Sequence, residues 1–363
     1  MDRTVLLVTN RRPEDSGGRA EKVATRRELL SAHGWDVAVA HMPEPYFAGF
    51  PFALWRCAGV GRTVDADAVL SINNPFHLHL GGYLLARHLG VPWIAEFRDP
   101  ILPRPDLERG SPRWYPAAAV ERLAVTRADR LLWYDGIQMA DDYFERTYPG
   151  ADPDRIVKLP FMGYRKSAFD AAEPAAYDRF TITYAGSFYE GWIEPYGFLS
   201  GLGTYADRTG DRDLTAQFYG DWDDDYGRAA TESGVEGLLS THEFVPHEDI
   251  IPVLKGSDAL LYVGGDDPDN ARNVPSKLFD YLGARTPILA LVDPDFRVAS
   301  FVEDNGLGVV APPDDPEAIA DAIEALRSGA FEYDPDPELF DRYTREASAG
   351  RIADALDAVT ANQ

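Results

Sequence analysis

Residues 275–280 combine side chains that suit phosphate and sugar binding. Pro275 and Ser276 form a typical helix start, and Lys277 follows them directly. Backbone N–H groups and the positive end of the helix dipole attract anions at such an N-terminus, where the Lys277 ammonium adds a second anchor. Asp280, three residues on, would accept a hydrogen bond from a sugar hydroxyl. The alternative is a surface ion pair between Lys277 and Asp280, the more frequent meaning of this spacing.

The scarcity of lysine favours the binding hypothesis. Lys277 is one of five lysines, while 60 acidic residues against 35 basic ones give a formal net charge of −25. The acidic excess is spread along the whole chain, which favours adaptation to high salt, where ions screen the self-repulsion. Such a surface would repel nucleic acid. The lone Cys57 excludes an internal disulfide, and we expect it to be a small buried side chain.

Two similar α/β domains are expected to position these residues. The length of 363 residues exceeds what one hydrophobic core usually supports. Short apolar runs alternate with helical patterns in both halves, which is typical of parallel sheets covered by helices on both faces. The predicted strands are residues 4–10, 36–41, 68–73, 92–99 and 130–135, and then 180–188, 214–220, 258–265 and 306–312.

A Pro- and Asp-rich stretch at 150–178 marks the junction between the domains. We place the first domain at 1–170 and the second at 171–336, and we expect the helical stretch at 337–363 to pack back onto the first. In open α/β sheets ligands bind beyond the carboxyl ends of the strands, so the expected site is a cleft between the domains. The sequence has no run of about 18 apolar residues and no signal-peptide pattern, so we expect a cytoplasmic protein.

Glycine-containing loops follow the first strand of each domain. Gly17 and Gly18 open a predicted helix, and Gly186 and Ser187 end an apolar strand. Glycine lets the backbone approach a ligand closely. Both loops are equally consistent with ordinary turns, and the first does not match the G-x-G-x-x-G dinucleotide motif.

A series of segments in order resembles the GT-B glycosyltransferases of the large group 1 family, which are retaining and family 4-like. They include "SGGRAEKVATRRELLSAHGWDVAVA", "PWIAEFRDP", "YAGSFYEG", "VPSKLFDYLG" and "GLGVVAPPDDPEAIADAI". The resemblance spans nearly the whole chain. It implies two Rossmann-like domains that face each other across a cleft, and transfer of a sugar from a nucleotide-diphosphate donor with retention of configuration. It implies no cofactor and no catalytic metal.

Residue roles follow from the resemblance position by position. It implies that Lys277 holds the diphosphate and that Asp280 takes the ribose hydroxyls, where the family usually has Glu. The full donor-binding set is Gly17, Gly18, Gly186, Ser187, Ser276, Lys277 and Asp280. The acceptor-side set is Asn73, Asn74 and His77, and packing is an equal alternative for His77. The candidate catalytic residues are Arg98, Asp99, Lys277 and Arg272, while Glu121 fits the family pattern with its role open.

Two departures from the family pattern concern charge near the donor. Arg272 stands eight residues before Asp280, where the family's E-x7-E pair predicts a carboxylate. The Arg and Lys that many members carry after the "AGS" loop are missing from "FYEGWIEPYG" (188–197). We therefore expect Arg272 to replace the lost positive charge near the diphosphate.

The predicted function is sugar transfer to a glycan or lipid-linked acceptor in surface polysaccharide or glycoprotein glycan assembly. The alternatives are a GT-B-type nucleotide-sugar epimerase and a non-catalytic glycan- or nucleotide-binding homologue. The aromatic-rich stretch 43–61, with Trp114, Tyr115 and Pro116, either packs in the core or forms an apolar surface for peripheral contact with the inner face of the cell membrane. The net negative charge argues against docking on anionic lipid by charge alone.

Overall fold

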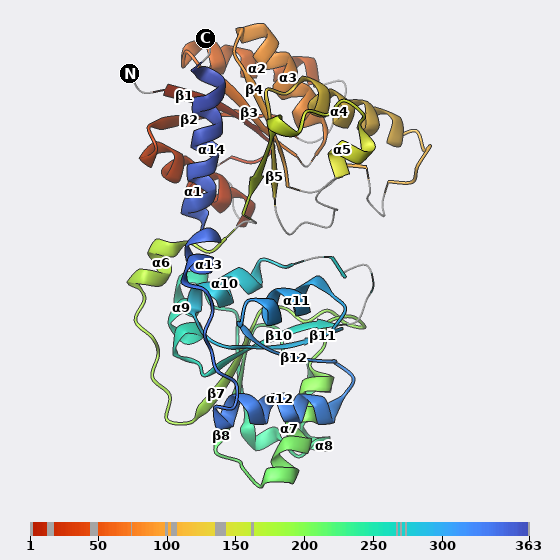
Figure 1. Cartoon of the computed structure of the whole chain (residues 1–363), viewed down its shortest axis with the longest axis vertical. Helices are drawn as coiled ribbons and strands as arrows, with labels where there is room; N and C mark the ends of the chain where they lie inside the picture. Colours follow the sequence, from red (N-terminus) through yellow and green to blue (C-terminus); the bar gives the residue numbers. More distant parts are fainter. Residues whose placement is uncertain are drawn as a thin grey trace. The chain divides into compact units, whose positions relative to one another are not determined.

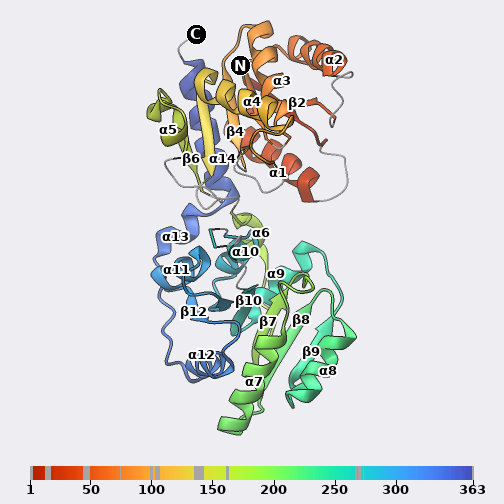
Figure 2. The same ribbon diagram turned by 90° about the vertical axis from the view of Figure 1, so that its right-hand side faces the viewer.

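The computed structural model divides the chain into two compact α/β units. Unit 1 comprises Met1–Met162 and Arg345–Gln363, and unit 2 comprises Gly163–Thr344. In both units helices flank a sheet of parallel strands (Figures 1 and 2), which confirms the predicted fold class. The structure describes residues 3–12, 18–43, 50–73, 75–98, 101–102, 107–134, 143–160, 163–265, 268, 271–272 and 274–361.

Unit 1 contains a six-stranded sheet with the order β2-β1-β3-β4-β5-β6. Its central strands are buried along their whole length, as expected for parallel strands covered by helices on both faces. The strands are β1 (Arg3–Thr9), β2 (Trp35–His41), β3 (Ala68–Ile72), β4 (Trp93–Phe97), β5 (Arg130–Tyr134) and β6 (Ile156–Leu159). The helices are α1 (Gly18–Ala32), α2 (Phe50–Thr63), α3 (His77–Leu89), α4 (Trp114–Arg127), α5 (Tyr143–Thr147) and α14 (Arg345–Thr360), with a short 3₁₀ helix at Pro153–Arg155.

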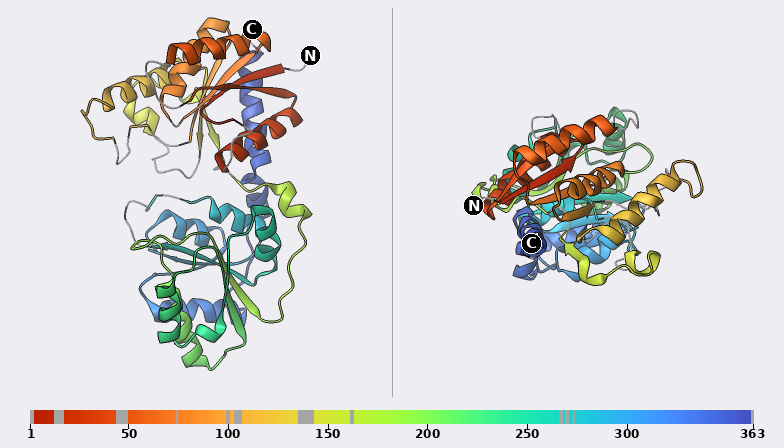
Figure 3. Two further views of the ribbon diagram at one scale, coloured as in Figure 1. Left: turned by 180° about the vertical axis from the view of Figure 1, so that it is seen from behind. Right: turned by 90° about the horizontal axis from the view of Figure 1, so that it is seen from above.

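Helix α14 joins the last part of the chain to the first strands of unit 1. The indole Nε1 of Trp35 donates to Asp357 at 2.8 Å, and Arg3 forms an ion pair with the same carboxylate at 2.5 Å. The helix runs beside α1 (Figure 3). The stretch 337–363 therefore divides between the units, because the preceding helix α13 (Pro337–Arg342) belongs to unit 2.

Unit 2 contains a second six-stranded parallel sheet with the order β12-β11-β10-β7-β8-β9. Its strands are β7 (Phe180–Ala185), β8 (Leu214–Tyr219), β9 (Leu239–His242), β10 (Ala259–Gly265), β11 (Ile288–Val292) and β12 (Gly308–Ala311). Its helices are α6 (Lys166–Ala171), α7 (Tyr196–Thr209), α8 (Asp224–Glu232), α9 (His247–Gly256), α10 (Lys277–Ala284), α11 (Arg297–Asp304), α12 (Pro316–Ser328) and α13, with a 3₁₀ helix at Glu236–Leu238. After β9 the chain crosses the sheet to β10, which pairs with β7 on the side away from β8. The carboxyl ends of the parallel strands β7, β8 and β10 therefore lie at the same edge of the sheet.

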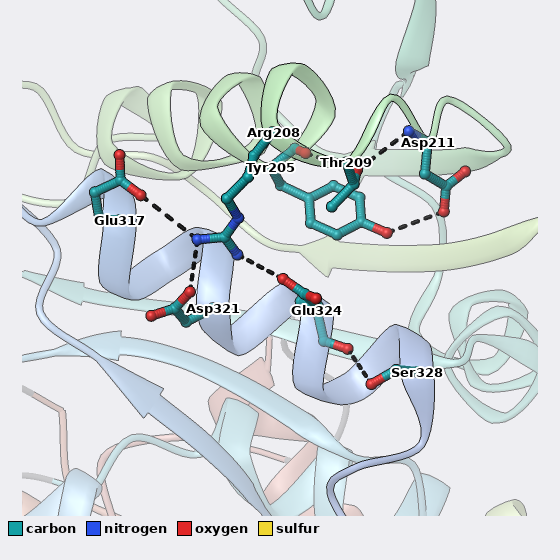
Figure 4. A network of polar contacts seen from close by, with 8 residues as sticks. All are labelled: Tyr205, Arg208, Thr209, Asp211, Glu317, Asp321, Glu324 and Ser328. Carbon is teal, nitrogen blue, oxygen red and sulfur yellow. Dashed lines mark hydrogen bonds and ion pairs between the residues drawn. The ribbon is translucent and has the colours of Figure 1, made fainter.

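The outer surface of unit 2 shows how the acidic residues are arranged. Arg208 of α7 contacts Asp321 at 2.6 Å, Glu324 at 2.7 Å and Glu317 at 3.5 Å, all on α12 (Figure 4). The three carboxylates are exposed, so water and salt screen their interaction with the guanidinium. One cation among three anions leaves this surface negative, in keeping with the composition of the chain.

Three local outcomes bear on the sequence predictions. Cys57 is 2% exposed, which confirms its expected burial. Strand β6 lies inside the Pro- and Asp-rich stretch that we assigned to the junction, because Ile156 and Val157 extend the sheet by pairing with β5. Among the helices that the structure describes, none has both the length and the apolar character needed to cross a bilayer.

Candidate functional site

The carboxyl ends of β7 and β8 are in direct backbone contact in unit 2. The N–H of Gly186 donates to the carbonyl oxygen of Tyr219 at 2.9 Å. Gly186 and Gly220 have φ values of 138° and 141°, a region that side chains strongly disfavour. A Cβ on Gly220 would lie 2.2 Å from the Gly186 carbonyl oxygen. The sequence therefore uses glycine here because the two loops touch, and the end of the sheet presents bare backbone.

Lys277, the first residue of α10, extends over this bare backbone. Its Nζ lies 3.9 Å from the centre of the Tyr184 ring, and a Cβ on Gly186 would come within 2.7 Å of the same nitrogen. Tyr184 is held in place by a hydrogen bond from its hydroxyl to the carbonyl oxygen of Ser187 at 2.7 Å. Desolvation lowers the pKa of Lys277 to about 7, because the ammonium loses much of its hydration. A weakly hydrated cation at this position is suited to bind an anion.

Helix α10 is fixed at the end of the sheet by its buried face. The hydroxyl of Tyr281 donates to the carbonyl oxygen of Leu261 at 2.9 Å, and Leu278 and Leu282 are fully buried. In the first turn the N–H groups of Leu278 and Phe279 donate to carbonyl oxygens three residues back, at 3.1 Å each. The amides of Ser276, at the N-cap, and of Lys277 remain the predicted anion donors.

Asp280 has a different partner from the one that its spacing suggests. Its Oδ1 lies 3.2 Å from Nε2 of His247, the first residue of α9. Within the described part of the chain, Lys277 and Asp280 form no ion pair with each other. The surface-pair alternative is therefore not what the structure shows, and the predicted contact of Asp280 with a ribose stays a prediction.

The remaining donor-side candidates are less constrained. Arg272 is exposed and, within the ranges described, forms no ion pair or hydrogen bond. Its neighbour Ala271 accepts a hydrogen bond from the N–H of Arg297 at 2.8 Å, which ties this segment to α11. Ser187 is partly exposed, and Gly18 is the first residue of α1. Gly17, Asn74 and Asp99 lie outside the described residues.

Unit 1 holds a buried charge cluster centred on Glu96, at the carboxyl end of β4. Arg26 from α1 donates two hydrogen bonds to the Glu96 carboxylate, one of them at 2.9 Å, and the hydroxyl of Tyr134 donates at 2.9 Å. Arg98 adds a third cationic contact through Nε at 3.1 Å. Burial by itself would raise the pKa of Glu96, but the Arg26 and Arg98 guanidinium groups outweigh it and lower the pKa to about 2.

Asn73 and Arg98 are brought together by this cluster. The side-chain oxygen of Asn73 accepts from the N–H of Arg98 at 2.8 Å, and the N–H of Asn73 donates to the Glu96 carbonyl oxygen at 3.1 Å. Asn73 is 1% exposed, so it positions the backbone beyond β4. Arg98 keeps part of its guanidinium exposed, with 21% of the side chain accessible.

Two further candidates have packing contacts. His77 begins α3, and its ring meets that of Phe50 edge-on at 6.3 Å. Glu121 is fully buried and accepts from the N–H groups of Ile101 and Leu102 and from the hydroxyls of Tyr143 at 2.7 Å and Tyr148 at 2.6 Å. These four donors give Glu121 a structural role, which the sequence left open.

Several site residues were missed by sequence reasoning. Glu96 and Arg26 lie inside quoted motifs, but no spacing links them because they come from different elements 70 residues apart. Tyr184 and His247 carried no signal beyond their positions next to a glycine loop and a helix start. The identity of their partners depends on the sheet order, which the sequence alone does not give.

Comparison with solved structures identifies the fold. The structure is similar to a glycosyltransferase from Rickettsia africae, with a TM-score of 0.66, 12% identity and full coverage of both chains. It is similar to Anabaena HepE in complex with UDP, with a TM-score of 0.58, 13% identity and coverage of 100% of this chain and 98% of that one. The chain has the GT-B fold.

A GT-B fold is shared by proteins with more than one activity. The UDP-GlcNAc 2-epimerase from Methanocaldococcus jannaschii also matches, with a TM-score of 0.57, 12% identity and coverage of 99% of this chain and 100% of that one. No protein-family model matches the sequence, and no curated protein matches it significantly. At these identities the likeness establishes the fold alone, and the function has to come from the site.

Proposed function

We propose that this GT-B protein is a glycosyltransferase that takes a sugar from a nucleotide-diphosphate donor. The observation that carries the proposal is the position of Lys277, at a helix N-terminus over the bare backbone of Gly186, with a pKa near 7 and no carboxylate beside it among the described residues. The description of HepE as a complex with UDP supports a nucleotide ligand for this fold. Lys277 and the Ser276 and Lys277 amides would hold the diphosphate, and Asp280 would take the ribose.

The proposed transfer goes to a glycan or lipid-linked acceptor with retention, in the assembly of a surface polysaccharide or glycoprotein glycan. The bond from the sugar C1 to the diphosphate oxygen breaks, a bond from C1 to the acceptor oxygen forms, and the acceptor's proton passes to the departing phosphate. Negative charge develops on the leaving group as the bond breaks. Lys277 would therefore stabilise the transition state more strongly than the ground state. Because the leaving group accepts the proton, no protein base is required. We propose that Lys277 and the helix amides neutralise the diphosphate without a catalytic metal, so EDTA should leave the rate unchanged.

The test is nucleotide release from a panel of UDP-, GDP- and dTDP-sugars at high salt, with and without lipid-linked acceptors. Release that depends on an acceptor is the expected result. An altered donor sugar without an acceptor would support the epimerase alternative, which the similarity to the M. jannaschii enzyme favours. Binding without turnover would instead identify a non-catalytic nucleotide-binding protein.

Arg272 is the second cation of the proposed site. We propose that its guanidinium supplements Lys277 when a diphosphate binds, since it is exposed and close in sequence to α10. The Arg272→Ala variant should then bind UDP several-fold more weakly, measured by calorimetry. Unaltered affinity would remove Arg272 from the site and leave Lys277 as the main phosphate ligand.

A further inference from the structure

The exposed side of α2 carries aromatic, aliphatic and basic residues. Phe52, Trp55 and Val60 are 61%, 69% and 38% exposed, and Arg56 is exposed next to Trp55. Their spacing of i, i+3, i+4 and i+8 puts all four on one side of the helix. We call these four residues the α2 face. Large side chains of this kind on a surface helix mark a contact with another molecule or with a membrane.

The fold keeps the α2 face turned to the solvent. Cys57 and Ala58, on the opposite side of α2, are buried, and a Cβ on Gly61 would lie 2.6 Å from a methyl carbon of Leu89 in α3. This close approach seats α2 against α3, at the outer side of unit 1 (Figure 2). The Phe52 and Trp55 rings stack on each other, with centres 6.0 Å apart and planes at 26°. The aromatic pair is thus a fixed feature of the surface of unit 1.

The charge around the α2 face is opposite to that of the whole chain. Residues 50–64, which include α2, contain two arginines and no acidic residue, and residues 68–95, which include α3, contain one arginine and no acidic residue. The turn between them contains Asp65, which is exposed, and Asp67, whose carboxylate accepts from the N–H of Thr4. Arg62 of α2 contacts His88 of α3, and Arg87 next to it is exposed. In a protein with 60 acidic residues, two neighbouring helices without any acid form a distinct basic surface. The net charge of −25 therefore does not describe the exposed surfaces of α2 and α3.

We propose that the α2 face docks on an anionic lipid surface. Phe52 and Trp55 would enter the headgroup region, where aromatic rings are favoured, and Arg56 and Arg62 would lie at the lipid phosphates. Each basic side chain near an anionic leaflet strengthens binding by about fivefold. A second copy of the chain fits less well, because a contact between two copies of this face would bring two surfaces of the same charge together. The inference is independent of the proposed function, since it involves neither Lys277 nor a nucleotide.

The experiment is vesicle flotation with the full chain, without nucleotide, at the lowest salt at which circular dichroism shows it folded. Vesicles of phosphatidylcholine and phosphatidylglycerol in equal parts are compared with vesicles of phosphatidylcholine alone. We expect binding to the mixed vesicles, reduced at least about tenfold by the double change Phe52→Gln with Trp55→Gln, and about fivefold by Arg56→Gln. The matched control is Phe244→Gln, which removes an aromatic side chain that is 56% exposed in unit 2 and should leave binding unchanged.

Three outcomes would overturn the proposal. They are absence of binding to the mixed vesicles, equal binding by the double variant, and self-association in sedimentation that the double variant abolishes. Folding of the variants is checked by denaturant titration, and the high exposure of both rings makes a loss of stability unexpected. The conservative change Trp55→Phe keeps an aromatic ring and should retain most of the binding, which separates insertion of the ring from a general effect of substitution.

Discussion

The Glu96 cluster of unit 1 and the Lys277 site of unit 2 each lie at the carboxyl end of a parallel sheet. They differ in whether the buried charge has a counterion within the protein. Glu96 is surrounded by two guanidinium groups and a tyrosine hydroxyl, so its charge is compensated inside the protein. Lys277 has an aromatic ring and a glycine as neighbours, and its pKa falls to about 7. A cluster that supplies its own counterions stabilises the fold, whereas a cation without one is available to a ligand.

The largest expected effect is on the compensated cluster. Glu96→Gln leaves the nearly buried Arg26 without its carboxylate, and breaking a buried ion pair in this way costs about 3–5 kcal/mol in the free energy of unfolding. Denaturant titration at high salt measures it. A loss below about 1 kcal/mol would show that the ion pair between Glu96 and Arg26 contributes no more than an exposed one. The difference in charge compensation between Glu96 and Lys277 would then have no energetic basis.

The same cluster should respond to acid. Because the folded pKa of Glu96, about 2, lies below its ordinary value of 4.5, the carboxylate contributes stability that is complete above pH 4.5 and is lost as the pH falls toward 2. The unfolding free energy of Glu96→Gln should therefore depend less on pH than that of the unchanged protein over this interval. Parallel pH profiles for the two proteins would contradict the assignment.

The next effect concerns the uncompensated cation. Lys277→Ala should weaken UDP binding by roughly ten- to a hundredfold, the loss of one charge-assisted contact, with little cost to stability because a desolvated ammonium is removed. Calorimetry measures the affinity and denaturant titration the stability. Lys158→Ala, a change at an exposed lysine in β6, serves as the control and should alter neither quantity. Equal UDP affinity in all three proteins would mean that Lys277 does not bind the nucleotide.

The pH should change the affinity by at most as much as the loss of the Lys277 side chain. A bound diphosphate raises the pKa of Lys277, so above the free-protein pKa of about 7 each binding event must take up a proton. The affinity for UDP should fall about tenfold per pH unit from pH about 7 to about 9, and stay level for this group below 7. Lys277→Arg keeps the charge at every pH and should flatten the profile. A steep profile in that variant would assign the titration to another group.

The smallest effect belongs to the exposed network of Arg208. Asp321→Asn removes one of three exposed carboxylates around the guanidinium, and the change in unfolding free energy should lie within the error of a denaturant titration. We propose that the chain as a whole is adapted to high salt, so raising the salt concentration should stabilise the protein far more than this single change alters it. Greater stability at low salt than at high salt would contradict that proposal.

The sequence predicted local structure better than partnerships between elements. The helix start at Ser276 and the strands at 180–185 and 259–265 follow from turn chemistry and apolar runs, which are local properties. The pairing of Asp280 with His247 and of Glu96 with Arg26 depends on strand order and helix placement, which a single sequence does not fix. The aromatic stretch around residue 52 could be predicted as apolar, but its division into a buried and an exposed side required the helix α2 to be seen in place.

The division of unit 1 between two distant parts of the chain has a consequence for synthesis. Trp35 and Arg3 contact Asp357, which is made about 200 residues after the first part of unit 1 ends at Met162. Until then unit 1 lacks α14 and the contacts that this helix makes. At 5–20 residues per second this takes roughly 10–40 s. During that time unit 2, which is continuous in sequence, is free to fold first. The helix that closes unit 1 is therefore made after the whole of unit 2.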